Sequence, residues 1–184
     1  FKKRELFKQS ALEKDIPVIL AQAELEYASI YATVNLEAFT AHFTAATSNV
    51  LKGLNWSNVV AAGGLVMSCL LNTKKRNSDM DDLELFLYDL NEESAKQKMK
   101  EIFATIQSNT KGACEMVRTR DYVTILAQYP VHHTRIVLRV FKHPAEVLCF
   151  TDMDCCCFYY TGTTVFTSER GRRALTKRCN FVDL

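Results

Sequence analysis

Two acidic pairs, each with one residue between its members, are the side chains in this sequence best suited to chemistry. Asp82 and Glu84 open one apolar stretch, and Asp152 and Asp154 enter a later one. Residues i and i+2 of a β-strand point to the same face, so each pair would present two carboxylates together. Mg²⁺ takes such oxygen ligands, and like charges held close together need a cation. A solvated strand start is the plainer interpretation of the first pair.

A glycine pair supplies a third feature. Gly63 and Gly64 follow the short apolar stretch 59–61 and precede a predicted helix over 65–71, with Ser68 one turn further on. Glycines at this point let the backbone approach a ligand closely, and the N–H groups at the helix start are available to an anion such as a triphosphate. Glycine pairs before helices are common, so this feature alone is a weak signal.

The elements that would position these residues alternate between helices and strands. Apolar spacing predicts helices over 17–31, 35–51, 65–71, 91–108, 144–148 and 168–178, with Asn91 as a helix N-cap. It predicts strands over 59–61, 82–88, 113–118, 122–128, 134–141, 152–160 and 164–167. The predicted class is α+β, a mixed β-sheet with flanking helices. An N-terminal helical segment over residues 1–53 precedes a domain over 54–184.

These features together resemble the nucleotidyltransferase superfamily of the DNA polymerase beta kind. In that pattern a glycine turn opens a helix, the next strand carries Asp-x-Asp or Asp-x-Glu, and a third acid lies on a later strand. The likeness is closer to a divergent branch that occurs in large DNA viruses and beside ankyrin repeats in eukaryotic proteins. It is carried by the stretches 59–71, 82–88, 135–148, 152–158 and 176–184, and it covers roughly residues 54–184.

The resemblance implies metal-dependent transfer of a nucleoside monophosphate from a nucleoside triphosphate to an acceptor, which could be a nucleic acid or a protein. The implied cofactor is Mg²⁺ or Mn²⁺. Asp82 and Glu84 would bind the metal, and Asp152 would complete the catalytic set, with Asp154 as the fallback metal ligand. The resemblance also implies that Gly63, Gly64 and Ser68 bind the nucleotide.

Several differences between this sequence and the nucleotidyltransferase pattern favour an alternative function. Leu65 follows Gly64 where many members of the superfamily have a serine, and the segment from Gly64 to Asp82 is longer than usual. The sequence stops at Leu184, whereas such enzymes continue into helices that help hold the nucleotide. Either the sequence is a fragment, or residues 1–53 supply that helical part. The alternative is a catalytically inactive module of the same fold, with a structural or protein-interaction role in a larger assembly. A toxin or antitoxin of this fold is a third class.

The amino-acid composition limits the class of protein, its partners and its cellular compartment. The 184 residues are 48% hydrophobic and 24% charged, which is typical of a globular domain. No apolar run reaches the roughly 18 residues that span a bilayer, so we expect no membrane partner. Twenty-three basic and 21 acidic residues give a net charge of +2, which does not indicate a dedicated nucleic-acid-binding domain. The seven cysteines include no CxxC pair, so we expect buried thiols and an intracellular protein, cytoplasmic or nuclear.

Of four further groups of residues, the two basic groups have two interpretations each. Lys74 to Arg76 could hold a phosphate, but a solvated loop is the favoured interpretation. Arg135 and Arg139 lie on one face of a predicted strand, where they would neutralise a triphosphate or pair with surface acids. His132 and His133 are expected to be loop residues. Cys155 to Cys157 are expected to alternate across a strand and to pack.

Overall fold

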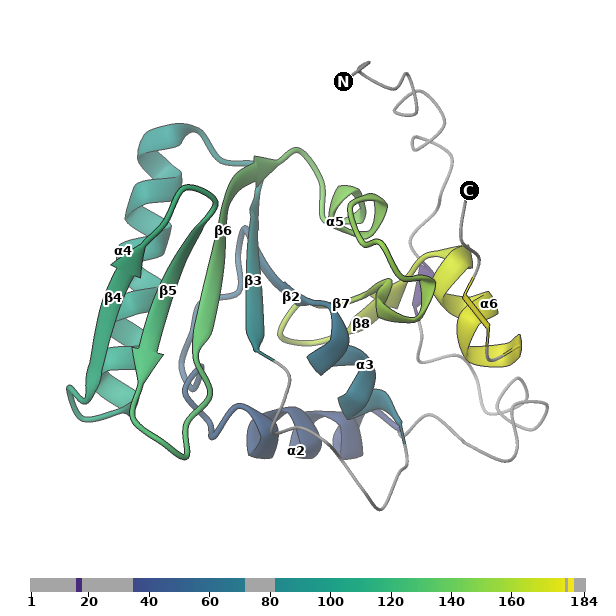
Figure 1. Ribbon diagram of the computed structural model, residues 1–184, viewed down its shortest axis with the longest axis horizontal. Helices are drawn as coiled ribbons and strands as arrows, with labels where there is room; N and C mark the ends of the chain where they lie inside the picture. The colour runs from purple at the N-terminus through teal and green to yellow at the C-terminus, as the bar shows by residue number, and fades with distance from the viewer. Residues whose placement is uncertain (1–15, 18–34, 72–81, 178, 181–184) are drawn as a thin grey trace.

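A mixed β-sheet of eight strands organises the molecule. The computed structural model describes residues 16–17, 35–71, 82–177 and 179–180 (Figure 1). The strand order is β1-β8-β7-β2-β3-β6-β5-β4. Among the paired strands of these residues, β3 and β6 alone run parallel, and the other pairs are antiparallel. The strands are β1 (Ile16–Pro17), β2 (Val59–Ala62), β3 (Leu83–Tyr88), β4 (Cys114–Arg118), β5 (Tyr122–Ala127), β6 (Thr134–Phe141), β7 (Phe158–Tyr160) and β8 (Val165–Thr167).

Helices flank this sheet, so the predicted α+β class with a mixed sheet is confirmed. They are α2 (Leu36–Ala46), α3 (Gly64–Leu70), α4 (Glu92–Asn109), α5 (Ala145–Cys149) and α6 (Glu169–Lys177), with a 3-10 helix η4 (Asp154–Cys156). Asn91 caps α4 as predicted, since its side-chain oxygen accepts a hydrogen bond from the Ser94 N–H at 2.8 Å. None of the helices in the described ranges is long and apolar enough to cross a membrane.

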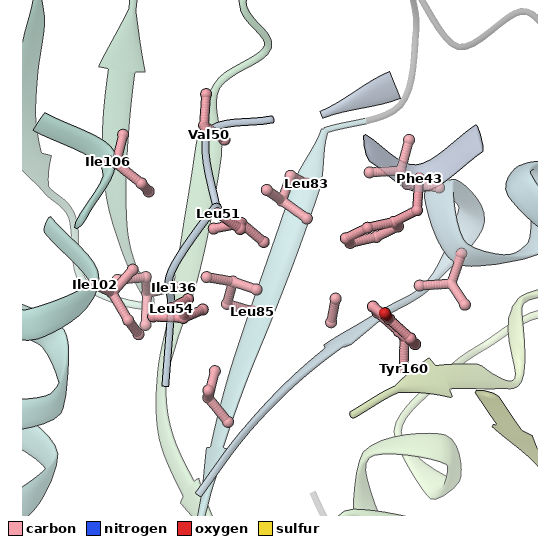
Figure 2. Close-up of a cluster of buried hydrophobic side chains, with 14 of the residues drawn as sticks. Phe43, Val50, Leu51, Leu54, Leu83, Leu85, Ile102, Ile106, Ile136 and Tyr160 are labelled. Carbon is pink, nitrogen blue, oxygen red and sulfur yellow. The ribbon is translucent and has the colours of Figure 1, made fainter. Parts of the chain in front are cut away.

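The main hydrophobic core lies on one face of the sheet and includes residues from both sides of position 53. Figure 2 shows Phe43 of α2 near Tyr160 of β7, and Leu51 and Leu54 beside the side chains of β3 and α4. All of these side chains belong to a single buried cluster. The described part of the N-terminal segment, residues 35–53, therefore packs into the same core as the sheet.

The described residues cover the opposite face of the sheet only in part. A smaller buried cluster joins β2 and β7 to Val147 and Leu148 of α5. Farther along the sheet, Figure 1 shows α4 behind β4 and β5, and no helix of the described residues is drawn in front of these two strands or of β6. The side chains on that front face, including Thr124 of β5 and Val117 of β4, are partly or fully exposed. We call this surface the open face.

The predicted strand over 152–160 is wrong for its first six residues. Residues 154–156 form η4, in which the Cys157 N–H donates to the Asp154 carbonyl at 3.1 Å, and β7 begins only at Phe158. A 3-10 turn does not alternate side chains between two faces. The Cys155 and Cys156 sulfurs accordingly lie 3.9 Å apart instead of on opposite sides.

Two helix predictions are also corrected. The helix predicted over 35–51 ends at Ala46, because Ser48 and Asn49 adopt left-handed backbone angles (φ 50° and 59°) that an α-helix excludes. Pro17 was expected in the first turn of a helix. It forms β1 with Ile16 instead and pairs with β8. The rest of the predicted helix 17–31 lies outside the described residues.

The hairpin between β7 and β8 requires a glycine at its turn, because the indole of Trp56 packs directly against that residue. Gly162 has φ +90°, and a Cβ atom there would lie 2.2 Å from Cγ of Trp56. The indole of Trp56 also packs against the rings of Phe43 and Tyr160, with centroids 6.3 and 5.3 Å away. Trp56 therefore joins α2, β7 and the hairpin turn.

Candidate functional site

The structure brings Asp82 and Glu84 together at the start of β3. Burial along this strand alternates, so that Leu83 and Leu85 face the core while Glu84 faces the open side. The Asp82 and Glu84 side chains are 34% and 30% exposed. The rule that residues i and i+2 share a strand face holds here, and both carboxylates are within reach of a ligand on the open face.

A single guanidinium, that of Arg135, contacts both carboxylates. Residue 135 of β6 stands opposite Glu84 in the parallel pairing of β3 and β6. One terminal nitrogen of Arg135 forms an ion pair with Asp82, and the other lies 3.7 Å from Oε1 of Glu84. Of the two roles that the sequence left open for Arg135, pairing with acids is the one seen in the structure.

The environment of Glu84 raises the pKa of its carboxyl above the ordinary value of 4.5. Partial burial is the largest cause, because it removes solvent from the charged form. The positive charge of Arg135 acts in the opposite direction, and the negative charge of Asp82 raises the pKa further. Among the described residues, burial thus outweighs the effect of Arg135 on the pKa of Glu84.

The glycine turn lies directly against this carboxylate. A Cβ atom built on Gly63 would lie 3.5 Å from Oε2 of Glu84, and the φ of Gly63 is +96°. The N–H of Gly63 donates to the Phe158 carbonyl at 3.2 Å, so the sheet already uses this donor. Gly64 is the first residue of α3. The strand, turn and helix arrangement predicted from the sequence is therefore present, and its turn adjoins the acidic pair.

Ser68 has a local partner. Its hydroxyl donates to the Leu65 carbonyl of the same helix at 2.9 Å, and the residue is half-buried. A hydroxyl held this way can still accept a hydrogen bond through its lone pairs. The structure gives Ser68 no contact with Asp82 or Glu84.

The second acidic pair does not act as a pair. Asp152 lies in an exposed bend before η4, whereas Asp154 is 1% exposed. Asp154 accepts from Nε of Arg170 at 2.7 Å and from Nη2 of Arg173 at 3.3 Å. Within the described ranges, no group of three or more His, Cys, Asp and Glu side chains is arranged to hold a metal ion. The structure thus does not join Asp152 or Asp154 to Asp82 and Glu84 in such a group.

The partners of Asp154 are the main feature that sequence analysis missed. Arg170 and Arg173 are three residues apart on α6, which places them on one side of that helix. That spacing was a readable signal, but the identity of their partner 16 to 19 residues earlier depends on tertiary structure. The basic stretch from Lys74 to Arg76 lies outside the described residues.

Arg139, the second arginine of β6 singled out above, lies apart from the carboxylates. Its guanidinium lies 3.8 Å from the ring centroid of Phe150 and 5.1 Å from that of Phe141. Arg135 and Arg139 therefore share a strand but have different partners.

Comparison with known proteins places the chain in a family. It is 23% identical to an uncharacterized protein, R883, of Acanthamoeba polyphaga mimivirus, over a match that covers 80% of this chain. The match spans 34% of that viral relative, about a third of its length. Residues 33–178 match the Gabija anti-defense 2 family, a match that includes α2 through α6 and therefore both the carboxylates and the core around them. The chain belongs to the Gabija anti-defense 2 family.

Proposed function

We propose that this chain is a nucleotidyltransferase-like module that transfers a nucleoside monophosphate from a nucleoside triphosphate to an acceptor. The observation that supports the proposal is the position of Asp82 and Glu84 on the open face, with the Gly63 turn against Glu84. Two carboxylates beside a backbone turn can serve both a cation and the phosphates that accompany it.

The two carboxylates fit the needs of Mg²⁺ or Mn²⁺. Mg²⁺ is typically bound through one or two carboxylates and the phosphates of a substrate, with water as the remaining ligands. Such an ion, when bound, would polarise the phosphoryl oxygens and lower the pKa of an acceptor hydroxyl. Asp82 and Glu84 would hold the ion on the open face. Gly63 carries no side chain, so a phosphate chain could approach the backbone beside Glu84.

The family name suggests a setting for this activity. It describes members of the family as acting against Gabija. We propose that the module contributes to that action by modifying an acceptor, either a nucleic acid or a protein. The expected result is that substitution of Asp82 and Glu84 abolishes the anti-Gabija effect without lowering the amount of folded protein.

A second candidate function has an observation of its own. Asp154 is bound by two arginines, and Asp152 joins no metal-binding group in the described residues. If the chemistry requires a third carboxylate, the described residues do not supply one beside Asp82 and Glu84. This favours a catalytically inactive module with a structural or protein-interaction role in a larger assembly.

Calorimetric titration with nucleoside triphosphates separates the two functions. The proteins are the wild type and the double variant Asp82→Asn, Glu84→Gln, each with and without Mn²⁺. Removing both negative charges should weaken metal-dependent nucleotide binding at least about tenfold, because the attraction between unit charges a few ångströms apart is lost. Glu115→Gln is the matched control, since Glu115 is an exposed acid of β4 on the same open face.

Two results would contradict nucleotidyl transfer. One is nucleotide binding that needs no metal and survives the double substitution. The other is the absence of binding to a folded wild type. Either result would favour the inactive module and direct the search to protein partners. Asp152→Asn adds information on the third carboxylate, because normal nucleotide binding with lost transfer would assign Asp152 a role in the reaction.

A further inference from the structure

The guanidinium of Arg135 lies against both carboxylates of the acidic pair. Its two terminal nitrogens contact Asp82 and Glu84, one each. We propose that Arg135 is an internal counter-ion that competes with a divalent cation for Asp82 and Glu84, and that the phosphates of a nucleotide draw it away. This inference rests on the proposed nucleotidyl-transfer function.

Charge balance explains why Arg135 should weaken metal binding. The two carboxylates and the guanidinium together carry a net charge of about −1, whereas the carboxylates alone would carry about −2. A divalent ion must displace the guanidinium or bind beside it, and both are unfavourable for like charges at short range. The metal affinity of the protein without nucleotide should therefore be low.

Arg135 is placed so that it can leave the carboxylates. Its side chain is 42% exposed, and it lies on the open face. The planar guanidinium forms paired hydrogen bonds with phosphate as readily as with carboxylate. The guanidinium carbon is 6.0 Å from the ring centroid of Tyr122, which offers an aromatic contact on the neighbouring strand. A phosphate beside Glu84 could therefore take over this side chain, and the two carboxylates would then need another cation to balance their charge.

The consequence is that metal and nucleotide should bind together. If nucleotide phosphates remove Arg135 from Asp82 and Glu84, they increase the affinity for the metal, and by linkage the metal increases the affinity for the nucleotide. Such coupling would keep the carboxylates partly neutralised by Arg135 until both ligands are present.

The test measures Mn²⁺ binding to the full chain without nucleotide, from the electron paramagnetic resonance signal of free Mn²⁺. Arg135→Gln should bind Mn²⁺ at least about tenfold more tightly than the wild type, because one competing positive charge is gone. Arg139→Gln is the matched control: it removes the same charge from the same strand, but Arg139 contacts Phe150 and Phe141. Arg135→Lys, which keeps the charge, should stay close to the wild type and guards against a folding defect of Arg135→Gln.

A second measurement, calorimetric binding of α,β-methylene ATP in the presence of Mn²⁺, separates failure of this inference from failure of the proposed function. Equal Mn²⁺ affinities for Arg135→Gln and wild type overturn the inference. If the wild type still binds the nucleotide through Asp82 and Glu84, the proposed function survives that result. If neither protein binds Mn²⁺ alone or the nucleotide with Mn²⁺, both proposals are wrong. A tenfold gain that Arg139→Gln also shows would assign the effect to net charge and would overturn the role of Arg135.

Discussion

At the scale of single residues, Glu84 is affected by its partial burial, by attraction to Arg135 and by repulsion from Asp82. Its neighbours in β3 face the core, its carboxylate lies beside Gly63, and its counter-charge comes from Arg135 of the adjacent strand. Desolvation is the largest of these effects on the pKa of Glu84. A carboxylate in this position loses part of its hydration, and a bound cation could compensate for that loss.

The pKa of Glu84 is directly testable by NMR titration. We expect a pKa above 4.5 in the wild type, a further rise in Arg135→Gln and a decrease in Asp82→Asn, because these substitutions remove a lowering and a raising charge. A raised pKa in the folded state means that Glu84 contributes stability below pH 4.5, which is lost as pH rises through the folded-state pKa. The free energy of unfolding of wild type should therefore fall relative to Glu84→Gln across that window. A decrease of the pKa in Arg135→Gln would contradict the assigned contacts.

The success and failure of sequence analysis at this scale have one physical cause. The i, i+2 rule placed Asp82 and Glu84 correctly because β3 is a regular strand with a buried side. The same rule failed for Asp152 and Asp154, because the Asp154 carboxylate is bound by arginines of α6 and the backbone there turns into η4. A local pattern contains no information about such a distant partner.

At the scale of elements, the joint between η4 and α6 is held by a buried charge. Asp154 is 1% exposed and pairs with Arg170 and Arg173, and the Cys155 N–H donates to the side chain of Asn180 at 2.9 Å. Gly171, between the two arginines in sequence, is held closely too: a Cβ atom there would lie 2.7 Å from the Cys157 carbonyl oxygen. Helix α6 is thus fixed to the strand that follows η4, which makes Asp154 a structural residue in this arrangement.

Substitution of the two neighbouring aspartates should have very different effects on stability. Asp154→Ala removes the buried carboxylate that two arginines contact and should lower the free energy of unfolding by about 3 kcal/mol, near the low end for a broken buried pair because the arginines are partly exposed. Asp152→Ala, in an exposed bend, should change it by less than about 0.5 kcal/mol. Urea unfolding followed by circular dichroism measures both. Equal effects of the two substitutions would contradict a structural role confined to Asp154.

At the scale of the whole molecule, a single core contains side chains from both sides of the boundary predicted at residue 53. The sequence predicts a helical segment over 1–53 and a separate domain over 54–184, but Phe39, Phe43 and Val50 are buried in the same cluster as the strands. Apolar spacing predicted the class, the mixed sheet and most of the elements. It could not show which helices share a core, because an apolar stripe indicates that a helix is covered and not what covers it.

Trp56, the one tryptophan of the sequence, reports on this shared core. Its indole packs against Phe43 of α2 and Tyr160 of β7, so its fluorescence should change when either element separates from the other. If α2 and the sheet unfold as one unit, the urea transitions seen by fluorescence and by far-UV circular dichroism should coincide. Phe43→Ala should lower the free energy of unfolding by about 3 kcal/mol and shift both transitions together, since Phe43 is 5% exposed.

Phe150→Ala removes the same side chain from a position that is 39% exposed, and should cost about 1 kcal/mol or less. A fluorescence transition that precedes the circular dichroism transition, and moves alone in Phe43→Ala, would mean that residues 35–53 separate from the sheet before it unfolds. The carboxylates would then lie on a unit that is stable without α2. Coincident transitions would instead make the open face depend on helices packed against the other side of the sheet. Core substitutions far from Asp82 and Glu84 would then weaken nucleotide binding only by unfolding the whole molecule.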